Sequence, residues 1–276
     1  MKIIFLDADG TLFHHEGYIP KSALRACRLA QKNEHKIFLC TGRQRVEIYG
    51  DMLELEYDGL ITGSGAHIEI GGKVLEERTF SRAQIDFLIN YLNAHDINAL
   101  FETTNGLVGD TKTKHQIDQM IQEQCSHLSK EQFQKHGLVQ VRHNLQVTDA
   151  IAQCPVNKVS FLESKTPYVQ IVEDLKDQFD LVPATFAPFG NQSGEISDKT
   201  ITKATGIQSV LEYYHCEKKD AIALGDGFND LCMFEAAGYS VAMGNAAKEV
   251  QEKADRITTC LEEDGIWNAF TFLHLI

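Results

Sequence analysis

The stretch that most constrains the fold is Ile3–Leu6, four large apolar residues in a row, followed by Asp7-Ala8-Asp9-Gly10. An apolar run with no alternating polar face predicts a strand buried on both sides, as in a parallel sheet covered by helices. In open α/β sheets ligands bind at the carboxyl ends of the strands, where Asp7 and Asp9 lie. Two carboxylates this close favour a cation or a shared proton between them. The alternative is a turn in which an aspartate caps the backbone and Gly10 takes a positive φ.

Short apolar runs alternate with helical spacing along much of the chain. Strands are predicted at Lys36–Cys40, Gly59–Thr62, Asp220–Leu224 and Ser240–Met243. Apolar residues at helical spacing predict helices over about 21–33, 44–55, 199–213 and 230–237, and further helices after 246 and 267. Alternating β and α units predict an α/β fold with a doubly wound, Rossmann-like parallel sheet as its core.

The middle of the chain has a different character. The change begins at about Ser81, after a candidate hairpin at 67–76. A candidate hairpin at 98–108 and candidate strands at 158–162 and 184–189 then mix with predicted helices at 83–94 and 168–179, and residues 112–155 are polar with no buried-strand signal. Hairpins mixed with helices predict a separate α+β unit inserted into the parallel domain. We therefore expect a core domain at 1–81 and 189–276 and an inserted α+β cap domain at 82–188.

Charge and cysteine content restrict the partners and the compartment. The 276 residues carry a net charge of −13, which argues against a nucleic-acid partner, since phosphate backbones are bound by basic surfaces. The seven cysteines form no Cys-x-x-Cys pair, so reduced thiols in a cytoplasmic protein are expected. The chain starts directly in a short strand and has no apolar run long enough for a membrane span, so neither a signal peptide nor a membrane association is expected.

Polar residues follow three of the predicted strands. Asp7 and Asp9 follow the first strand, Thr41-Gly42-Arg43 the second, and Asp226 in Gly225-Asp226-Gly227-Phe228-Asn229-Asp230 a later one. These ends share one edge of a parallel sheet, so the carboxylates and a hydroxyl converge on one cleft. Oxygen ligands without His or Cys favour Mg²⁺, which takes one or two carboxylates together with substrate phosphate oxygens.

These segments, with Lys203 in Thr202-Lys203-Ala204, match in order the four motifs of the haloacid dehalogenase-like phosphatase superfamily. The segments Ala242-Met243-Gly244-Asn245-Ala246, Ala254-Asp255 and Glu263-Asp264-Gly265 resemble its Cof-type branch, whose large type IIB cap lies between the second and third motifs. The resemblance covers about residues 1–80 and 190–276. It implies a phosphoric monoester hydrolase with a core and an inserted cap.

The resemblance also implies a role for the first two aspartates. Asp7 is expected to attack phosphorus and form an aspartyl-phosphate. Asp9 is expected to protonate the leaving group and then to deprotonate the attacking water, so the two carboxyl groups need different protonation states. Mg²⁺ would be held by the Asp7 carboxylate, the Asp9 backbone carbonyl and the Asp226 carboxylate, with Asp230 in support.

Substrate binding is expected to involve residues from the other motifs. Thr41 and Lys203 would hold the phosphoryl oxygens as catalytic groups, and Asn229, Gly42 and Arg43 would contact substrate. Each residue also has a plainer interpretation. Lys203 could be a solvated helix lysine, the segments at 41–42 and 225–227 could be turns, and Arg43 could pair with an acidic neighbour.

Four further residues bear on these expectations. His14-His15 suggests a metal site, although two exposed loop histidines are the better interpretation because no third ligand is evident. Ser64 lies where Cof-type members commonly have Asn, and Ala204 where Gly is usual. These departures affect the expected substrate contacts and cap hinge, and leave the nucleophile and metal positions intact.

The sequence thus predicts a Mg²⁺-dependent phosphatase acting on a small phosphorylated metabolite such as a sugar phosphate. A phosphomutase of the same superfamily and a phospholigand-binding regulatory protein without turnover are the alternatives. The expected assembly is a monomer or a weak homo-oligomer.

Overall fold

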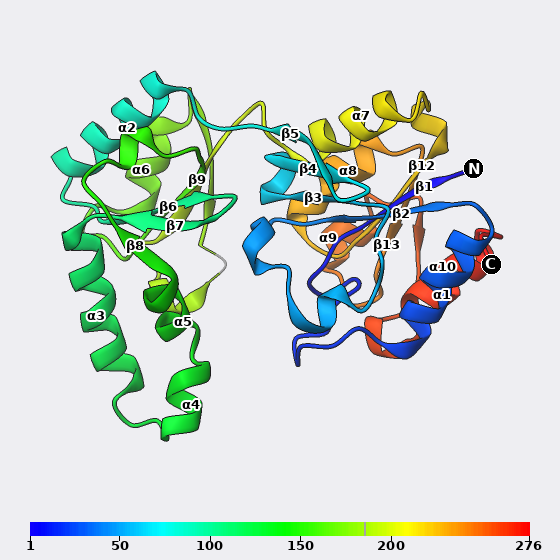
Figure 1. Ribbon diagram of the computed structural model, residues 1–276, viewed down its shortest axis with the longest axis horizontal. Coiled ribbons are helices and arrows are strands. Elements are labelled where there is room, and N and C mark those ends of the chain that lie inside the picture. The colour runs from blue at the N-terminus through cyan, green and yellow to red at the C-terminus, as the bar shows by residue number, and fades with distance from the viewer. Residues whose placement is uncertain (185) are drawn as a thin grey trace. The chain divides into compact units, whose positions relative to one another are not determined.

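The computed structural model describes residues 1–184 and 186–276, which form two compact units (Figure 1). The first unit comprises Met1–Arg78 and Thr200–Ile276, and the second comprises Thr79–Lys199. The insertion is therefore longer than the predicted 82–188. Its C-terminal boundary moves because β11 (Gly194–Asp198) pairs with β9 and β10 of the second unit.

The first unit is built on an eight-stranded sheet with the order β14-β13-β12-β1-β2-β3-β4-β5. Its strands are β1 (Ile3–Leu6), β2 (Lys36–Cys40), β3 (Gly59–Thr62), β4 (His67–Ile70), β5 (Lys73–Glu77), β12 (Ala221–Gly225), β13 (Tyr239–Ala242) and β14 (Arg256–Ile257). All pairs from β14 to β3 are parallel, whereas β4 and β5 run antiparallel. The predicted doubly wound parallel sheet is confirmed, with β1 paired on both sides.

Alternate residues of β1 point to opposite faces of the sheet, as expected for a strand. Ile4 and Leu6 pack against α1 (Lys21–Lys32) and α10 (Gly265–Phe272), while Ile3 and Phe5 belong to the cluster around α7 (Lys203–Tyr213) and α8 (Leu231–Ala236). A short helix, α9 (Lys248–Gln251), adds Val250 to the second cluster. Helices cover both faces, which explains why β1 is apolar throughout.

The second unit contains a six-stranded sheet with the order β10-β11-β9-β6-β7-β8. Its strands besides β11 are β6 (Ala99–Thr103), β7 (Gly106–Gly109), β8 (Leu145–Val147), β9 (Val156–Phe161) and β10 (Phe179–Pro183). Helices α2 (Arg82–Ala94) and α6 (Tyr168–Leu175) pack into one hydrophobic cluster, and α3 (Thr111–Cys125) and α5 (Gly137–Asn144) into another, with α4 (Lys130–Lys135) beside them. The unit is α+β, as predicted.

Several predicted elements are wrong. The helix over 44–55 is replaced by two 3-10 turns, Arg45–Glu47 and Gly50–Leu53, separated near Gly50, whose φ is +59°. The strand at 184–189 is also wrong, because Ala187–Phe189 is a 3-10 turn containing Pro188, which cannot donate to a ladder; Thr185 lies outside the described residues. The polar stretch 112–155 holds helices α3 to α5, which bury few apolar side chains.

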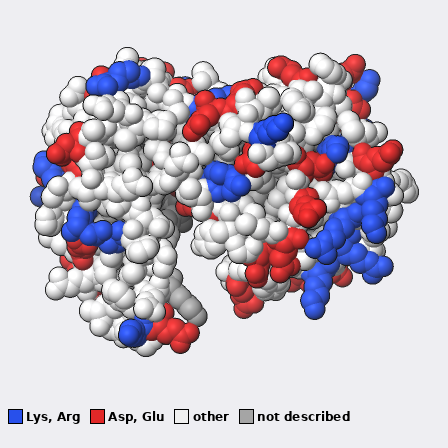
Figure 2. All heavy atoms as spheres, in the orientation of Figure 1, with Lys and Arg blue, Asp and Glu red and all other residues white. Residues whose placement is uncertain are grey.

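Lys and Arg gather on the outer face of α1, as Figure 2 shows on a molecule with a net charge of −13. The exposed cations there are Lys21, Arg25, Arg28 and Lys32. Two of them also hold the helix in place. The Arg25 guanidinium lies 5.1 Å from the centre of the Trp267 ring, and Arg28 donates to the Glu54 carbonyl at 2.9 Å. None of the described helices combines the length and apolar character that a bilayer span needs.

Candidate active site

Asp7 and Asp226 lie at the ends of the adjacent strands β1 and β12. The register pairs Leu6 with Leu224, and the Asp7 amide donates to the Leu224 carbonyl at 3.0 Å. Carboxylate oxygens of Asp7, Asp226 and Asp230 lie within 4.8 Å of one another. The parallel pairing therefore brings together residues more than 200 positions apart in sequence, as the sequence predicts for this edge of the sheet.

Lys203 is the first residue of α7 and is buried, with 1% of its surface exposed. Its Nζ donates to Asp7 Oδ1 at 2.5 Å and to Asp230 Oδ1 at 2.6 Å. Burial alone lowers the pKa of a lysine, but here the Asp7 and Asp230 carboxylates outweigh it and raise the pKa of Lys203. The interpretation of Lys203 as a solvated helix lysine is wrong. The helix predicted to begin at 199 begins at Lys203 because Thr202 caps it.

Asp7 is almost fully buried, and burial raises its pKa to about 7 even though the Lys203 ammonium lowers it. Burial likewise raises the pKa of Asp226 to about 6, against the hydrogen bond from Thr11. Oδ1 of Asp7 accepts from Lys203, while Oδ2 accepts no hydrogen bond from any residue that the structure describes. One Asp7 oxygen is thus fixed and the other is free to react.

Asp230 is completely buried, and both of its carboxylate oxygens are already used. Oδ1 accepts from Lys203, and Oδ2 accepts from the amides of Asp226 at 3.0 Å and Gly227 at 2.9 Å. These bonds shape the loop that carries Asp226. Asp230 therefore supports the site by holding Lys203 and Asp226, and it has less capacity to hold an ion itself.

Asp9 lies outside this group of carboxylates and is held by Arg43. Arg43 Nε donates to Asp9 Oδ2 at 2.7 Å and Nη2 to Oδ1 at 2.6 Å, a bidentate pair in which the Asp9 side chain is 54% exposed. The carboxylate hydrogen bond raises the pKa of Arg43. Of the two predicted roles for Arg43, the structure shows pairing with an acidic neighbour. The Asp9 side chain, which is expected to protonate the leaving group, is held in an ion pair in this conformation.

Thr41 and Asn229 differ in burial and in hydrogen bonding. Thr41 follows β2, next to β1 in the sheet, and is buried; its Oγ1 accepts from the Arg43 amide at 3.1 Å. Gly42 continues this turn toward Arg43. Asn229 is exposed within the turn Phe228–Asp230, and its side chain makes no hydrogen bond to another described residue.

Two residues that the sequence analysis did not assign hold Asp226. Thr11 Oγ1 donates to Asp226 Oδ1 at 2.8 Å, and Asn245 Nδ2 donates to the Gly10 carbonyl at 2.9 Å and faces Asp226 Oδ2 at 3.4 Å. Gly10 has φ +83°, and a Cβ there would collide with the Asp226 carboxylate. In the sequence, the position of Thr11 directly after Asp7-Ala8-Asp9-Gly10 is the feature that could have indicated its role at the site.

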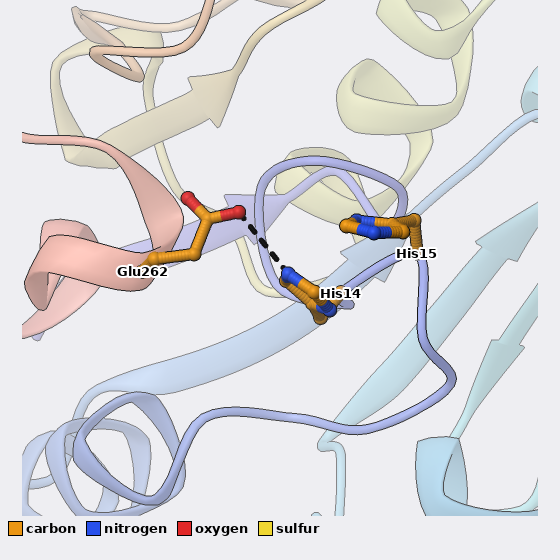
Figure 3. A group of neighbouring side chains, drawn as sticks. All are labelled: His14, His15 and Glu262. Carbon is orange, nitrogen blue, oxygen red and sulfur yellow. Dashed lines mark hydrogen bonds and ion pairs between the residues drawn. The ribbon is translucent and has the colours of Figure 1, made fainter.

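His14, His15 and Glu262 form a second group whose ligand atoms lie within 4.8 Å of one another (Figure 3). The expectation of two exposed histidines is wrong for His14, which is 6% exposed. Its Nδ1 accepts from the Glu16 amide at 3.2 Å, so the proton of the neutral ring lies on Nε2, which faces Glu262 Oε1 at 3.1 Å. A metal ion would need that nitrogen unprotonated. The group is therefore a hydrogen-bonded tether between the loop after β1 and Glu262.

The comparisons with known proteins agree with this geometry. A family model described as haloacid dehalogenase-like hydrolase matches residues 4–270. The 5-amino-6-(5-phospho-D-ribitylamino)uracil phosphatase YwtE of Bacillus subtilis is 25% identical over 277 residues, which are 96% of each chain. Phosphatase YwpJ of the same organism is 22% identical over 292 residues, covering 100% of both chains.

Solved structures show the same fold. A Geobacillus kaustophilus protein described as hypothetical aligns over 100% of this chain and 99% of its own, with a TM-score of 0.82 and 23% identity. A sugar phosphatase of subclass IIB of the superfamily aligns over 100% of both chains, with a TM-score of 0.77 and 22% identity. With the family match spanning nearly the whole chain, this protein is a Cof-type phosphatase of the haloacid dehalogenase-like hydrolase family.

Proposed function

We propose that the protein is a Mg²⁺-dependent phosphatase that hydrolyses a small phosphorylated metabolite through an aspartyl-phosphate on Asp7. The observation that carries this proposal is the environment of Asp7. One carboxylate oxygen is anchored by the buried Lys203 ammonium, and the other is free to attack phosphorus. A buried ammonium beside the nucleophile supplies the positive charge that phosphoryl transfer requires.

The residues present fit a magnesium ion. Asp7 and Asp226 offer carboxylate oxygens, the ligand type that Mg²⁺ prefers, on two adjacent strand ends. Burial raises the pKa of both groups in spite of the nearby Lys203 ammonium, and a divalent cation would compensate their remaining charge. When bound, the ion would neutralise charge on the transferring phosphoryl group. Asp7, Asp226 and the Asp9 backbone carbonyl would hold it, with Asp230 behind them.

The reaction divides into two displacements. Asp7 Oδ2 attacks phosphorus, the bond from phosphorus to the substrate oxygen breaks, and Asp9 gives its proton to the departing alkoxide. In the second step Asp9 takes a proton from water, whose oxygen attacks phosphorus and frees Asp7 and inorganic phosphate. Lys203, Thr41 and the backbone at Gly42 would hold the phosphoryl oxygens, and Asn229 would assist.

Arg43 sets a condition for this chemistry. Both Asp9 carboxylate oxygens accept hydrogen bonds from the Arg43 guanidinium, so neither is open to a leaving group. At least one of these hydrogen bonds must therefore break before Asp9 acts as the acid. Arg43 would hold the Asp9 side chain until substrate arrives and would then be available to the substrate.

We assign the choice of substrate to the second unit and propose a sugar phosphate or similar metabolite. Two relatives or neighbours are named for compounds of this kind, a phosphoribityl derivative and a sugar phosphate. We propose no nucleic-acid or membrane partner, and a monomer or weak homo-oligomer. Cytoplasmic location is part of the proposal, because all seven cysteines are free thiols, as expected in a reducing compartment.

The test is hydrolysis of an aryl phosphate by wild type, Asp7→Asn and Asp9→Asn, with and without Mg²⁺. Asp7→Asn should lose turnover, and Asp9→Asn should lose turnover but keep Mg²⁺ affinity, measured by calorimetry. Asp86→Asn, in an exposed pair with Arg82, is the matched control and should stay active. Undiminished turnover in Asp7→Asn would exclude the nucleophile assignment. A screen of phosphorylated metabolites for phosphate release would then identify the substrate.

A further inference from the structure

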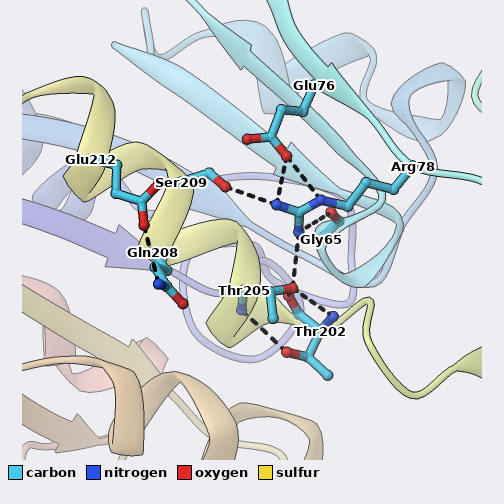
Figure 4. A network of polar contacts seen from close by, with 8 residues as sticks. All are labelled: Gly65, Glu76, Arg78, Thr202, Thr205, Gln208, Ser209 and Glu212. Carbon is cyan, nitrogen blue, oxygen red and sulfur yellow. Dashed lines mark hydrogen bonds and ion pairs between the residues drawn. The ribbon is translucent and has the colours of Figure 1, made fainter.

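Arg78 ends the first segment of the first unit and connects three parts of that unit (Figure 4). Its Nε and Nη2 donate to Glu76 Oε2 at 2.9 and 2.6 Å, and its Nη1 lies 3.4 Å from the Gly65 carbonyl. Two further bonds reach α7. Nη1 donates to Thr205 Oγ1 at 2.9 Å, and Nη2 donates to Ser209 Oγ at 2.7 Å. Thr205 and Ser209 are four positions apart, so the guanidinium holds one face of the first turns of α7.

The contact with Thr205 reaches the turn that contains Lys203. Thr205 Oγ1 donates to the Thr202 carbonyl at 2.9 Å and accepts from the Thr202 amide at 3.1 Å. Its second lone pair takes the Arg78 proton, so the hydroxyl makes every hydrogen bond it can. The Thr205 amide in turn donates to Thr202 Oγ1 at 3.2 Å. Lys203 lies inside this closed set of bonds, and Arg78 links the set to Glu76 and to the Gly65 carbonyl.

A close backbone contact limits the movement of the same turn from the other side. Gly65 has φ +106°, and a Cβ there would collide with the Thr202 carbonyl oxygen. Gly206, one turn into α7, would place a Cβ 2.7 Å from Ile61. The start of α7 therefore rests directly on the 3-10 turn Gly63–Gly65 and cannot move closer to it. The two hydrogen bonds from Arg78 oppose movement in the other direction.

We propose that Arg78 is a positioning residue for catalysis, which fixes the first turn of α7 so that the Lys203 ammonium stays between Asp7 and Asp230. The proposal rests on the proposed function, in which Lys203 binds the transferring phosphoryl group. Glu76 pairs with Arg78, so the two charges compensate locally. The effect of Arg78 on the site is therefore one of geometry, transmitted through Thr205 and Thr202.

The test compares Arg78→Met and Arg78→Lys with Arg45→Met. Arg45 is a matched control, because it pairs with Glu69 in the same unit and makes no hydrogen bond to α7. We expect kcat for an aryl phosphate to fall about 10- to 100-fold in Arg78→Met, as for other small displacements of a catalytic group, with KM changed by less than about threefold. Arg78→Lys keeps the charge but cannot reach both hydroxyls, so most of the loss should remain. Arg45→Met should keep its activity.

A second measurement does not depend on activity. The amides of Thr205 and Gly206 bond to Thr202, so Arg78→Met should raise their hydrogen-exchange rates by about tenfold, and Arg45→Met should leave them unchanged. If Arg78→Met does not fold, Ser209→Ala removes one of the two bonds to α7 and should shift both measurements in the same direction by a smaller amount.

The outcomes separate the two claims. A wild-type protein without Mg²⁺-dependent hydrolysis would overturn the proposed function, and the exchange experiment would still test the attachment of α7 by Arg78. In an active protein, a kcat for Arg78→Met no lower than that of Arg45→Met would overturn the positioning role. Unchanged exchange at Thr205 and Gly206 would do the same.

Discussion

Lys203→Met removes a buried ammonium from between two carboxylates, and its effect on stability should depend on pH in a specific way. Removing one partner of a buried ion pair generally costs about 3–5 kcal/mol, because the remaining charge is left without compensation. Here two buried carboxylates, Asp7 and Asp230, lose the same partner. We therefore expect a loss of about 3–5 kcal/mol in the free energy of unfolding near pH 7 without metal.

The pH dependence follows from Asp7. Its pKa is raised to about 7 in the folded protein, above its ordinary value near 4 in the unfolded chain, so stability declines as pH rises through this range. The wild-type decline from this group ends once Asp7 ionises near pH 7. Without Lys203 the pKa of Asp7 is higher still, so the variant continues to lose about 1.4 kcal/mol per pH unit. The difference in the free energy of unfolding between wild type and Lys203→Met should be constant below pH 7. It should widen by about 2 kcal/mol at pH 8.5.

The measurement is denaturant unfolding in EDTA from pH 5.5 to 8.5, followed by the fluorescence of Trp267. This is the single tryptophan, and it lies in the unit that contains the site. Lys36→Met is the matched control, because Lys36 pairs with Asp58 at 2.7 Å while remaining partly exposed, and its removal should cost at most about 1 kcal/mol without a widening above pH 7. Equal losses in the two variants, or a constant difference up to pH 8.5, would refute the reasoning.

Three further predictions concern the same unit. Mg²⁺ should raise the melting temperature more at pH 8 than at pH 5.5, because Asp7 and Asp226, with pKa values of about 7 and 6, are largely protonated at the lower pH; equal shifts would contradict this. Gly10→Ala should cost about 1–2 kcal/mol and weaken Mg²⁺ binding in calorimetry, since φ is +83° and the new methyl group meets Asp226; unchanged affinity would contradict it. Ser64→Asn should raise the free energy of unfolding by up to about 1 kcal/mol, because φ is +56° and Asn tolerates this conformation, whereas Ser64→Val should lower it; the reverse order would exclude strain at this position.

The sequence predicts those residues of the site that lie directly after the ends of strands. Asp7, Thr41 and Asp226 lie directly after buried apolar strands, and the parallel pairing of those strands decides where these residues meet. The burial of Lys203 is harder to predict from the sequence, because its position depends on the cap at Thr202 and on a close contact with Gly65. Such contacts join segments that are distant in sequence, and local patterns do not record them.

The elements that sequence reasoning missed have a common physical origin. The helices within 112–155 bury few side chains each, so the apolar periodicity that marks a helix is weak there. Residues 44–55 have apolar residues at nearly helical spacing, yet Gly50 has a positive φ that an α-helix does not allow. The bidentate pairing of Arg43 with Asp9 depends on side-chain reach across 34 positions, which spacing within one motif cannot reveal.

The position of β1 in the middle of its sheet has a consequence for synthesis on the ribosome. One neighbour, β2, follows soon after it, but the other, β12, emerges only after the whole of Thr79–Lys199 has been translated. At 5–20 residues per second that interval is on the order of ten seconds. During it one edge of an entirely apolar strand has no partner, whereas the inserted unit is continuous in sequence and can fold first. Until β12 is made, the open edge of β1 is exposed to pairing with other chains.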